Sequence, residues 1–129
     1  MTTKVIQTSL PADPQSVRVA RGLVEGLRDH ILAEAVDDLK LLISEVVTNS
    51  IRHAGLVPGE TVGVKIIIRK DVVRTEVTDS GNGFTPGSRT REDSDTQGWG
   101  LEVVEHLSSR WGIRNNSVTT VWFEIDLAA

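Results

Sequence analysis

Two side chains suited to proton transfer and metal binding lie four residues apart in a segment with helical periodicity. Glu45 and Asn49 fall within the stretch from about Glu34 or Asp37 to His53, and this spacing puts both on one helix face, about one turn apart. Carboxylate and amide oxygens suit Mg²⁺, and a carboxylate could also take a proton from a hydroxyl or water beside a bound γ-phosphate. An ordinary solvated helix face would show the same pair.

A second group with chemical potential is an acidic residue followed by two glycines. The β-branched run Val72 to Thr78 ends in Asp79-Ser80-Gly81-Asn82-Gly83. Glycine tolerates positive φ and has no Cβ, so a ligand can approach the backbone of such a loop. Asp79 could accept a hydrogen bond from an exocyclic amine and so favour adenine, or it could cap its own turn.

A second glycine pair lies further along the chain. Gly98-Trp99-Gly100 opens a helical pattern, and helix N-termini attract phosphate. The polar stretch 84–97 between the two pairs shows no hydrophobic period. The order of strand, acid, glycine loop, polar lid, glycine loop and helix suggests a nucleotide site, although a plain loop-to-helix junction would also contain such glycines.

Composition narrows the class of protein. The 129 residues favour a single domain over 1–129. With 14 basic against 18 acidic residues, the net charge of −4 argues against a nucleic-acid binder. The chain has no cysteine and three unclustered histidines, so we expect no disulfide and no transition-metal site. We see no signal peptide and no apolar run of about 20 residues, and therefore expect a cytoplasmic protein without a membrane span.

The helices that would position these residues are indicated by apolar side chains recurring every three or four positions. After a break at Pro11-Ala12-Asp13-Pro14, Ser16 is expected to cap a first helix that ends near His30. The second helix ends at His53, before Gly55. A third spans Leu101 to about Ser109.

Strands are indicated where the apolar period changes to two. We expect a first strand over Lys4–Leu10, a hairpin of 62–68 and 72–78 across Lys70-Asp71, and a last hairpin of 111–114 and 119–127. Strands in hairpins with helices between them predict an α+β fold. It would be a two-layer sandwich, with an antiparallel or mixed sheet covered on one face by about three helices.

Taken together, these motifs resemble those of a known superfamily. Glu45-x-x-x-Asn49, Asp79-x-Gly81-x-Gly83 and Gly98-x-Gly100-Leu101 are similar, in order and position, to the three nucleotide-binding boxes of the GHKL ATPases, which have the Bergerat fold. More narrowly, Ser16-Val17-Arg18-x-Ala20-Arg21, the segment 42–49 and the closing 119–124 resemble the anti-sigma-factor serine/threonine kinases. The resemblance covers nearly the whole chain.

The resemblance implies a role for each matching residue. Glu45 would be the general base, Asn49 would bind Mg²⁺, and Asp79 would read the adenine amine with support from Thr119. The remaining positions would contact or enclose ATP or ADP: Gly81, Gly83, Gly98, Trp99, Gly100 and Leu101 around the pocket and lid, Arg52 and His53 on the phosphate side, and Arg89 and Arg91 as further phosphate contacts or solvated lid charges.

Two departures from the family pattern bear on the nucleotide site. Trp99 stands where a smaller residue is usual between the second glycines, and Val118 stands where a glycine commonly precedes the threonine. The lid is also short and carries Glu92, Asp93 and Asp95, which would repel a triphosphate unless they point outward.

The function implied by the resemblance is that of an ATP- and Mg²⁺-dependent protein serine/threonine kinase of the partner-switching type. Its partners would be a STAS-domain anti-anti-sigma factor, which it phosphorylates, and a sigma factor, which it sequesters. Relatives often form homodimers through the first strand and helix. The alternative that Trp99 and the acidic lid motivate is a nucleotide-binding interaction module that sequesters a partner with little or no phosphotransfer.

Overall fold

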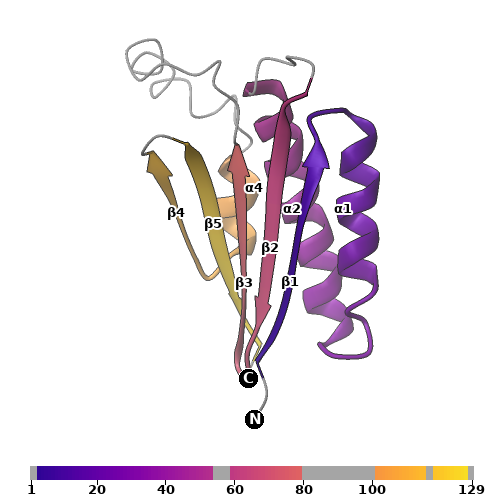
Figure 1. Cartoon of the computed structure of the whole chain (residues 1–129). Helices are drawn as coiled ribbons and strands as arrows, with labels where there is room; N and C mark the ends of the chain where they lie inside the picture. Colours follow the sequence, from indigo (N-terminus) through magenta and orange to yellow (C-terminus); the bar gives the residue numbers. More distant parts are fainter. Residues whose placement is uncertain (1–2, 54–58, 80–100, 116–117, 128–129) are drawn as a thin grey trace.

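A computed structural model describes residues 3–53, 59–79, 101–115 and 118–127 (Figure 1). In this part of the chain, strands and helices follow one another in the order that the sequence predicts. The elements are β1 (Lys4–Pro11), α1 (Gln15–Glu25), α2 (Ala33–His53), β2 (Thr61–Ile68), β3 (Val72–Asp79), α4 (Leu101–Leu107), β4 (Arg110–Asn115) and β5 (Thr119–Asp126).

The five strands form one sheet in the order β1-β2-β3-β5-β4. Every neighbouring pair is antiparallel, so the described sheet is fully antiparallel and not mixed. The β2–β3 connection is the expected tight turn, in which the Arg69 N–H donates to the Val72 carbonyl at 2.9 Å. The predicted α+β fold is confirmed.

The helices form the second layer on one face of this sheet (Figure 1). Helix α2 packs against β2, β3 and β5, while α1 and α4 pack against α2. Side chains of β2 and β3 alternate between buried and less buried positions, which confirms the period-two pattern. Phe123 of β5 is among the largest fully buried side chains in the core between the layers.

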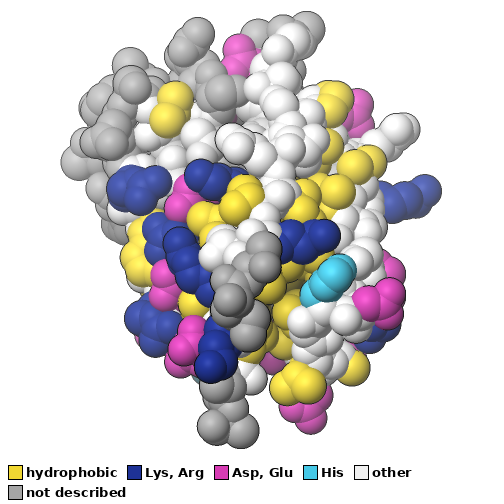
Figure 2. Space-filling model, turned by 60° about the horizontal axis from the view of Figure 1, so that its bottom comes forward, with side chains coloured by type: hydrophobic (Ala, Val, Ile, Leu, Met, Phe, Trp, Pro, Cys, Tyr) yellow, Lys and Arg dark blue, Asp and Glu magenta, His cyan; other side chains and the backbone are white. Residues whose placement is uncertain are grey.

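The other face of the sheet carries charged side chains that pair both within β3 and across strands. Arg74 bonds Glu76 and Glu124 at 2.9 Å each, and its guanidinium lies 4.3 Å from the centroid of the Trp122 ring. Hydrogen bonds from Arg110 and then Arg74 lower the pKa of the Glu124 carboxyl. Lys and Arg side chains also lie beside Asp and Glu on the face shown in Figure 2, which balances their charge locally.

Two helix boundaries differ from expectation. Ser16 does not cap α1, because the helix already begins at Gln15; its hydroxyl donates instead to the Pro11 carbonyl at 2.6 Å. Helix α1 ends at Glu25 and not near His30. Gly26 follows it directly, and glycine is a poor helix former.

Helix α4 is also shorter than predicted and ends at Leu107. The chain turns there because the Ser109 N–H donates to the Glu124 carbonyl at 2.7 Å, which ties it to β5. None of the helices in the described ranges is long and apolar enough to span a bilayer.

Candidate functional site

The predicted site residues that the structure describes gather at one end of the molecule, the upper end in Figure 1. Strand β3 ends there at Asp79, β5 begins there at Thr119, and α2, which packs against β3, has its C-terminal end there. Residues from three distant parts of the sequence therefore meet at one edge of the sandwich.

Asp79 and Thr119 lie directly opposite each other on adjacent antiparallel strands. Both side chains are buried and both take part in polar interactions. A buried carboxylate is costly unless it is hydrogen-bonded, so Asp79 occupies a position where polar contacts are required. The register places Thr119 beside Asp79. The support of Asp79 by Thr119 and their contact with adenine remain predictions.

On the outer face of the sheet, the neighbouring residues of the same two strands form a pair of hydroxyls. The Oγ1 atoms of Thr78 and Thr120 lie 3.1 Å apart. Cross-strand threonine pairs of this kind add to sheet stability. Only the register of β3 against β5 reveals this partner of Thr120.

Helix α2 presents Glu45, Asn49 and Arg52 on one face, as the four- and three-residue spacings require. Glu45 is half-buried and Arg52 is exposed. No described residue forms a hydrogen bond or ion pair with the Glu45 carboxylate. The shared face of Glu45 and Asn49 is the one that their spacing predicts.

Asn49 is only 4% exposed, and its Nδ2 atom has no hydrogen-bond partner within the described part of the chain. A buried amide left unpaired costs about 1–3 kcal/mol. A half-turn of the amide would exchange its nitrogen and oxygen, so the position can offer either a donor or an oxygen ligand to a bound group. Such a side chain fits a site that a ligand completes.

Several predicted residues cannot be placed. Residues His53 and Leu101 are described only as the last residue of α2 and the first of α4. The other positions lie outside the described residues: Gly81, Gly83, Arg89, Arg91, Gly98, Trp99 and Gly100. Their roles stay predictions. Among the described residues, no three His, Asp or Glu side chains are grouped so that they could hold a metal ion by themselves.

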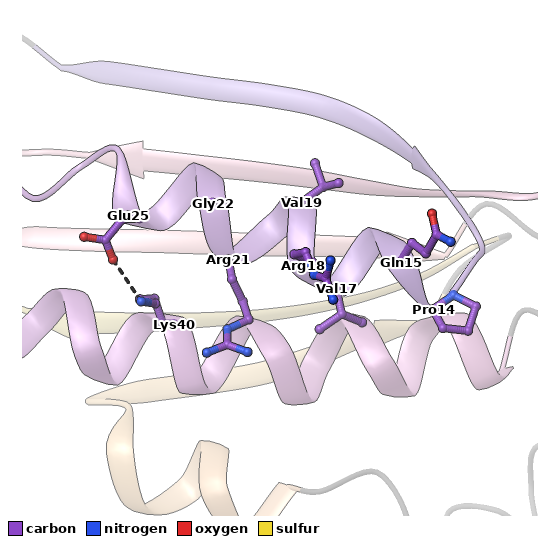
Figure 3. Close-up of a pocket in the computed structure, with 9 residues that line it drawn as sticks. All are labelled: Pro14, Gln15, Val17, Arg18, Val19, Arg21, Gly22, Glu25 and Lys40. Carbon is purple, nitrogen blue, oxygen red and sulfur yellow. Dashed lines mark hydrogen bonds and ion pairs between the residues drawn. The ribbon is translucent and has the colours of Figure 1, made fainter.

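A separate hollow of about 850 Å³ lies along α1, away from these residues (Figure 3). Arg21 extends from α1 toward α2, and Lys40 of α2 reaches Glu25 at 2.8 Å. Arg18 also lines this hollow, and neither arginine has an acidic partner within the described ranges. Sequence analysis did not predict this basic surface.

Comparison with known proteins identifies the family to which this arrangement belongs. The sequence profile of the histidine kinase-like ATPase domain matches residues 10–125, which is most of the chain. The chain belongs to the histidine kinase-like ATPase domain family. The superfamily resemblance drawn from the three motifs is therefore confirmed.

Within this family, the chain is similar to proteins named serine-protein kinase RsbW. It is 36% identical over 91 residues to that of Listeria monocytogenes serovar 1/2a, covering 67% of this chain and 57% of the relative's length. It is 30% identical over 139 residues to the Bacillus velezensis protein, covering 94% of this chain and 86% of the relative. The Bacillus subtilis protein is 28% identical over 132 residues.

Proposed function

We propose that this protein is an ATP-dependent protein serine/threonine kinase and anti-sigma factor of the partner-switching type. Its substrate would be a STAS-domain anti-anti-sigma factor, and a sigma factor would be its second partner. The relatives' name supports the kinase activity. The observation that carries the proposal is the α2 face. There the Glu45 carboxylate, which has no hydrogen-bond or ion-pair partner among the described residues, stands one turn from Asn49, whose buried Nδ2 atom likewise has no partner among them.

Asp79 would select adenine by accepting a hydrogen bond from its exocyclic amine, with Thr119 beside it. The burial of both side chains and their direct pairing support this role. Arg52, His53 and the glycine motifs would lie toward the phosphates. These assignments rest on the family pattern.

Mg²⁺ fits the chemistry of the same face. Asn49 can present an amide oxygen, and Mg²⁺ prefers oxygen ligands while keeping waters and substrate phosphates in its shell. When bound, the ion would neutralise charge on the phosphates. A single protein ligand is compatible with such a site, because phosphate oxygens and waters would supply the others.

Glu45 would act as the general base in phosphoryl transfer. Its carboxylate would take the proton of a serine or threonine hydroxyl, whose oxygen forms a bond to the γ-phosphorus. The bond from that phosphorus to the bridging β,γ-oxygen breaks, and ADP leaves. The chain's own contribution is positioning and one proton acceptor.

The proposal is tested by phosphotransfer from γ-labelled ATP to STAS-domain proteins of the same organism. Glu45→Ala is expected to abolish transfer and leave ATP binding intact. Glu34→Ala, which removes an exposed carboxylate from the first turn of the same helix, is the matched control and should transfer at the wild-type rate. Unchanged transfer by Glu45→Ala would refute the role of Glu45.

A second candidate function is sequestration of a partner with little or no phosphotransfer. The hollow along α1 favours it, because Arg18 and Arg21 line its surface without acidic partners among the described residues. An acidic segment of a partner would suit this surface. ATP binding together with no phosphate transfer to any STAS-domain protein would favour this function over the kinase.

Two further expectations complete the proposal. We propose that the protein acts in the cytoplasm as a single domain. We also propose a homodimer through the first strand and helix; β1 is an edge of the described sheet, which makes its outer backbone groups available for pairing. Sedimentation at several concentrations would measure that association.

A further inference from the structure

An apolar groove of about 330 Å³ lies between α2 and α4, and neither the sequence motifs nor the proposed ATP site accounts for it. Its lining includes three aliphatic side chains, Leu41, Val103 and Leu107. Val103 and Leu107 are partly buried against the core, whereas Leu41 is 49% exposed. Leucine exposed to this extent beside two other aliphatic side chains leaves apolar surface that a binding partner can cover.

The groove lies about one helical turn from the proposed general base. Leu41 and Glu45 are four residues apart on α2, so they lie on the same face and about 6 Å apart along the helix axis. Asn49 continues the same row toward the nucleotide end. A protein segment that brings a hydroxyl to Glu45 and runs along α2 toward its N-terminus would have its neighbouring residues near Leu41.

We infer that the α2–α4 groove receives an apolar side chain of the protein substrate, close in sequence to the phosphorylated serine or threonine. This inference rests on the proposed kinase function. An extended chain rises about 3.3 Å per residue, and side chains two positions apart point the same way. The distance from Glu45 to Leu41 thus corresponds to a residue two positions from the acceptor.

The polar residues at the groove indicate what it would exclude. Glu102 lines it and carries a carboxylate, so an acidic substrate side chain at this position would be repelled. His106 also lines it, and its ring is fixed by a 2.8 Å hydrogen bond between Nδ1 and the Glu102 carbonyl. The groove therefore selects an aliphatic side chain over an acidic one.

Leu41→Ala tests the inference, with Leu32→Ala as the matched control. Leu32 is 65% exposed and precedes α2, so its truncation removes the same atoms outside the groove. Using the STAS-domain protein that the wild type phosphorylates, we expect Leu41→Ala to lower kcat/KM about tenfold, mainly through KM. The ATP dissociation constant should not change, and Leu41→Met should restore most of the loss.

Truncating the substrate provides the second arm of the test. Alanine is introduced into the substrate at the apolar positions two residues before and two residues after the phosphorylated serine or threonine. At one of these positions the substitution should lower kcat/KM as much as Leu41→Ala does. Combining that substrate with the Leu41→Ala kinase should give no further loss of kcat/KM. Equal kcat/KM for Leu41→Ala and Leu32→Ala would overturn the inference and leave the kinase proposal intact. Absence of transfer by the wild type to every STAS-domain protein would overturn both.

Discussion

One threonine hydroxyl of β3 is expected to destabilise the fold. Thr75 is fully buried on the core side of the strand, opposite Ile66 and Phe123, and its Oγ1 has no hydrogen-bond partner in the part of the chain that the structure describes. Valine has nearly the same shape with a methyl group in place of the hydroxyl. Thr75→Val should therefore stabilise the protein, whereas the same substitution at Thr78 should destabilise it.

The expected changes in the free energy of unfolding follow from the surroundings of the Thr75 and Thr78 hydroxyls. A buried polar group without a partner costs about 1–3 kcal/mol, so Thr75→Val should raise the free energy of unfolding by at least about 1 kcal/mol. The Thr78 hydroxyl bonds that of Thr120 at 3.1 Å, and Thr120 is buried. Losing this bond should lower the free energy of unfolding by about 1 kcal/mol.

Urea unfolding measures both effects. With a slope of about 2 kcal/mol per M, the midpoint should rise by about 0.5 M in Thr75→Val and fall by about 0.5 M in Thr78→Val. The slope itself should stay constant, because neither substitution changes the surface exposed on unfolding. A lower midpoint in Thr75→Val would refute the reasoning, since the hydroxyl would then have a stabilising partner.

Two further predictions concern the outer sheet face and the helix pair. A Cβ at Gly112 would lie 2.7 Å from Nε1 of Trp122, so Gly112→Ala should displace the ring and cost about 1–3 kcal/mol in urea unfolding; an equal cost in the Trp122→Val background would contradict this cause. Hydrogen bonds from Arg28 and then Lys40 lower the pKa of Glu25 from 4.5 to about 2. A lowered pKa means that the ionised carboxylate stabilises the fold above pH 4.5 and that this contribution is lost as the pH falls toward 2. Carboxyl NMR should show that titration, and a midpoint near 4.5 would argue against these bonds.

The sequence was sufficient to predict the sheet and helices because their periods are strong. Val62, Val64 and Ile66 alternate with polar or small residues, and the structure buries them on one face. The α2 face of Glu45 and Asn49 also followed directly, since helical spacing alone determines it. Both properties are local, so the sequence of a single segment is enough to predict them.

Contacts between distant segments could not be predicted in the same way. The pairing of Asp79 with Thr119 depends on the register of β3 against β5, and a shift of one residue would reverse every side chain. Only the family resemblance linked these two residues. The close packing of Gly112 and Trp122 likewise depends on how β4 and β5 align.

The ends of the helices and the role of exposed apolar residues also could not be predicted from the apolar periodicity. The apolar period continued past Gly26, yet α1 stops at Glu25. Leu41 lies outside the apolar stripe of α2, and its position four residues before Glu45 was the available signal for the groove. The position of α4 beside α2 was also needed to recognise Leu41 as part of a groove.

The most direct test of the central claim is ATP binding by titration calorimetry, with and without Mg²⁺. We compare the wild type with Asp79→Asn and with Asp71→Asn, which changes an exposed aspartate in the turn just before the opposite end of β3. The account predicts Mg²⁺-dependent binding that weakens at least about tenfold in Asp79→Asn and is unchanged in Asp71→Asn. Equal affinities in the two variants, or no binding by the wild type, would contradict it.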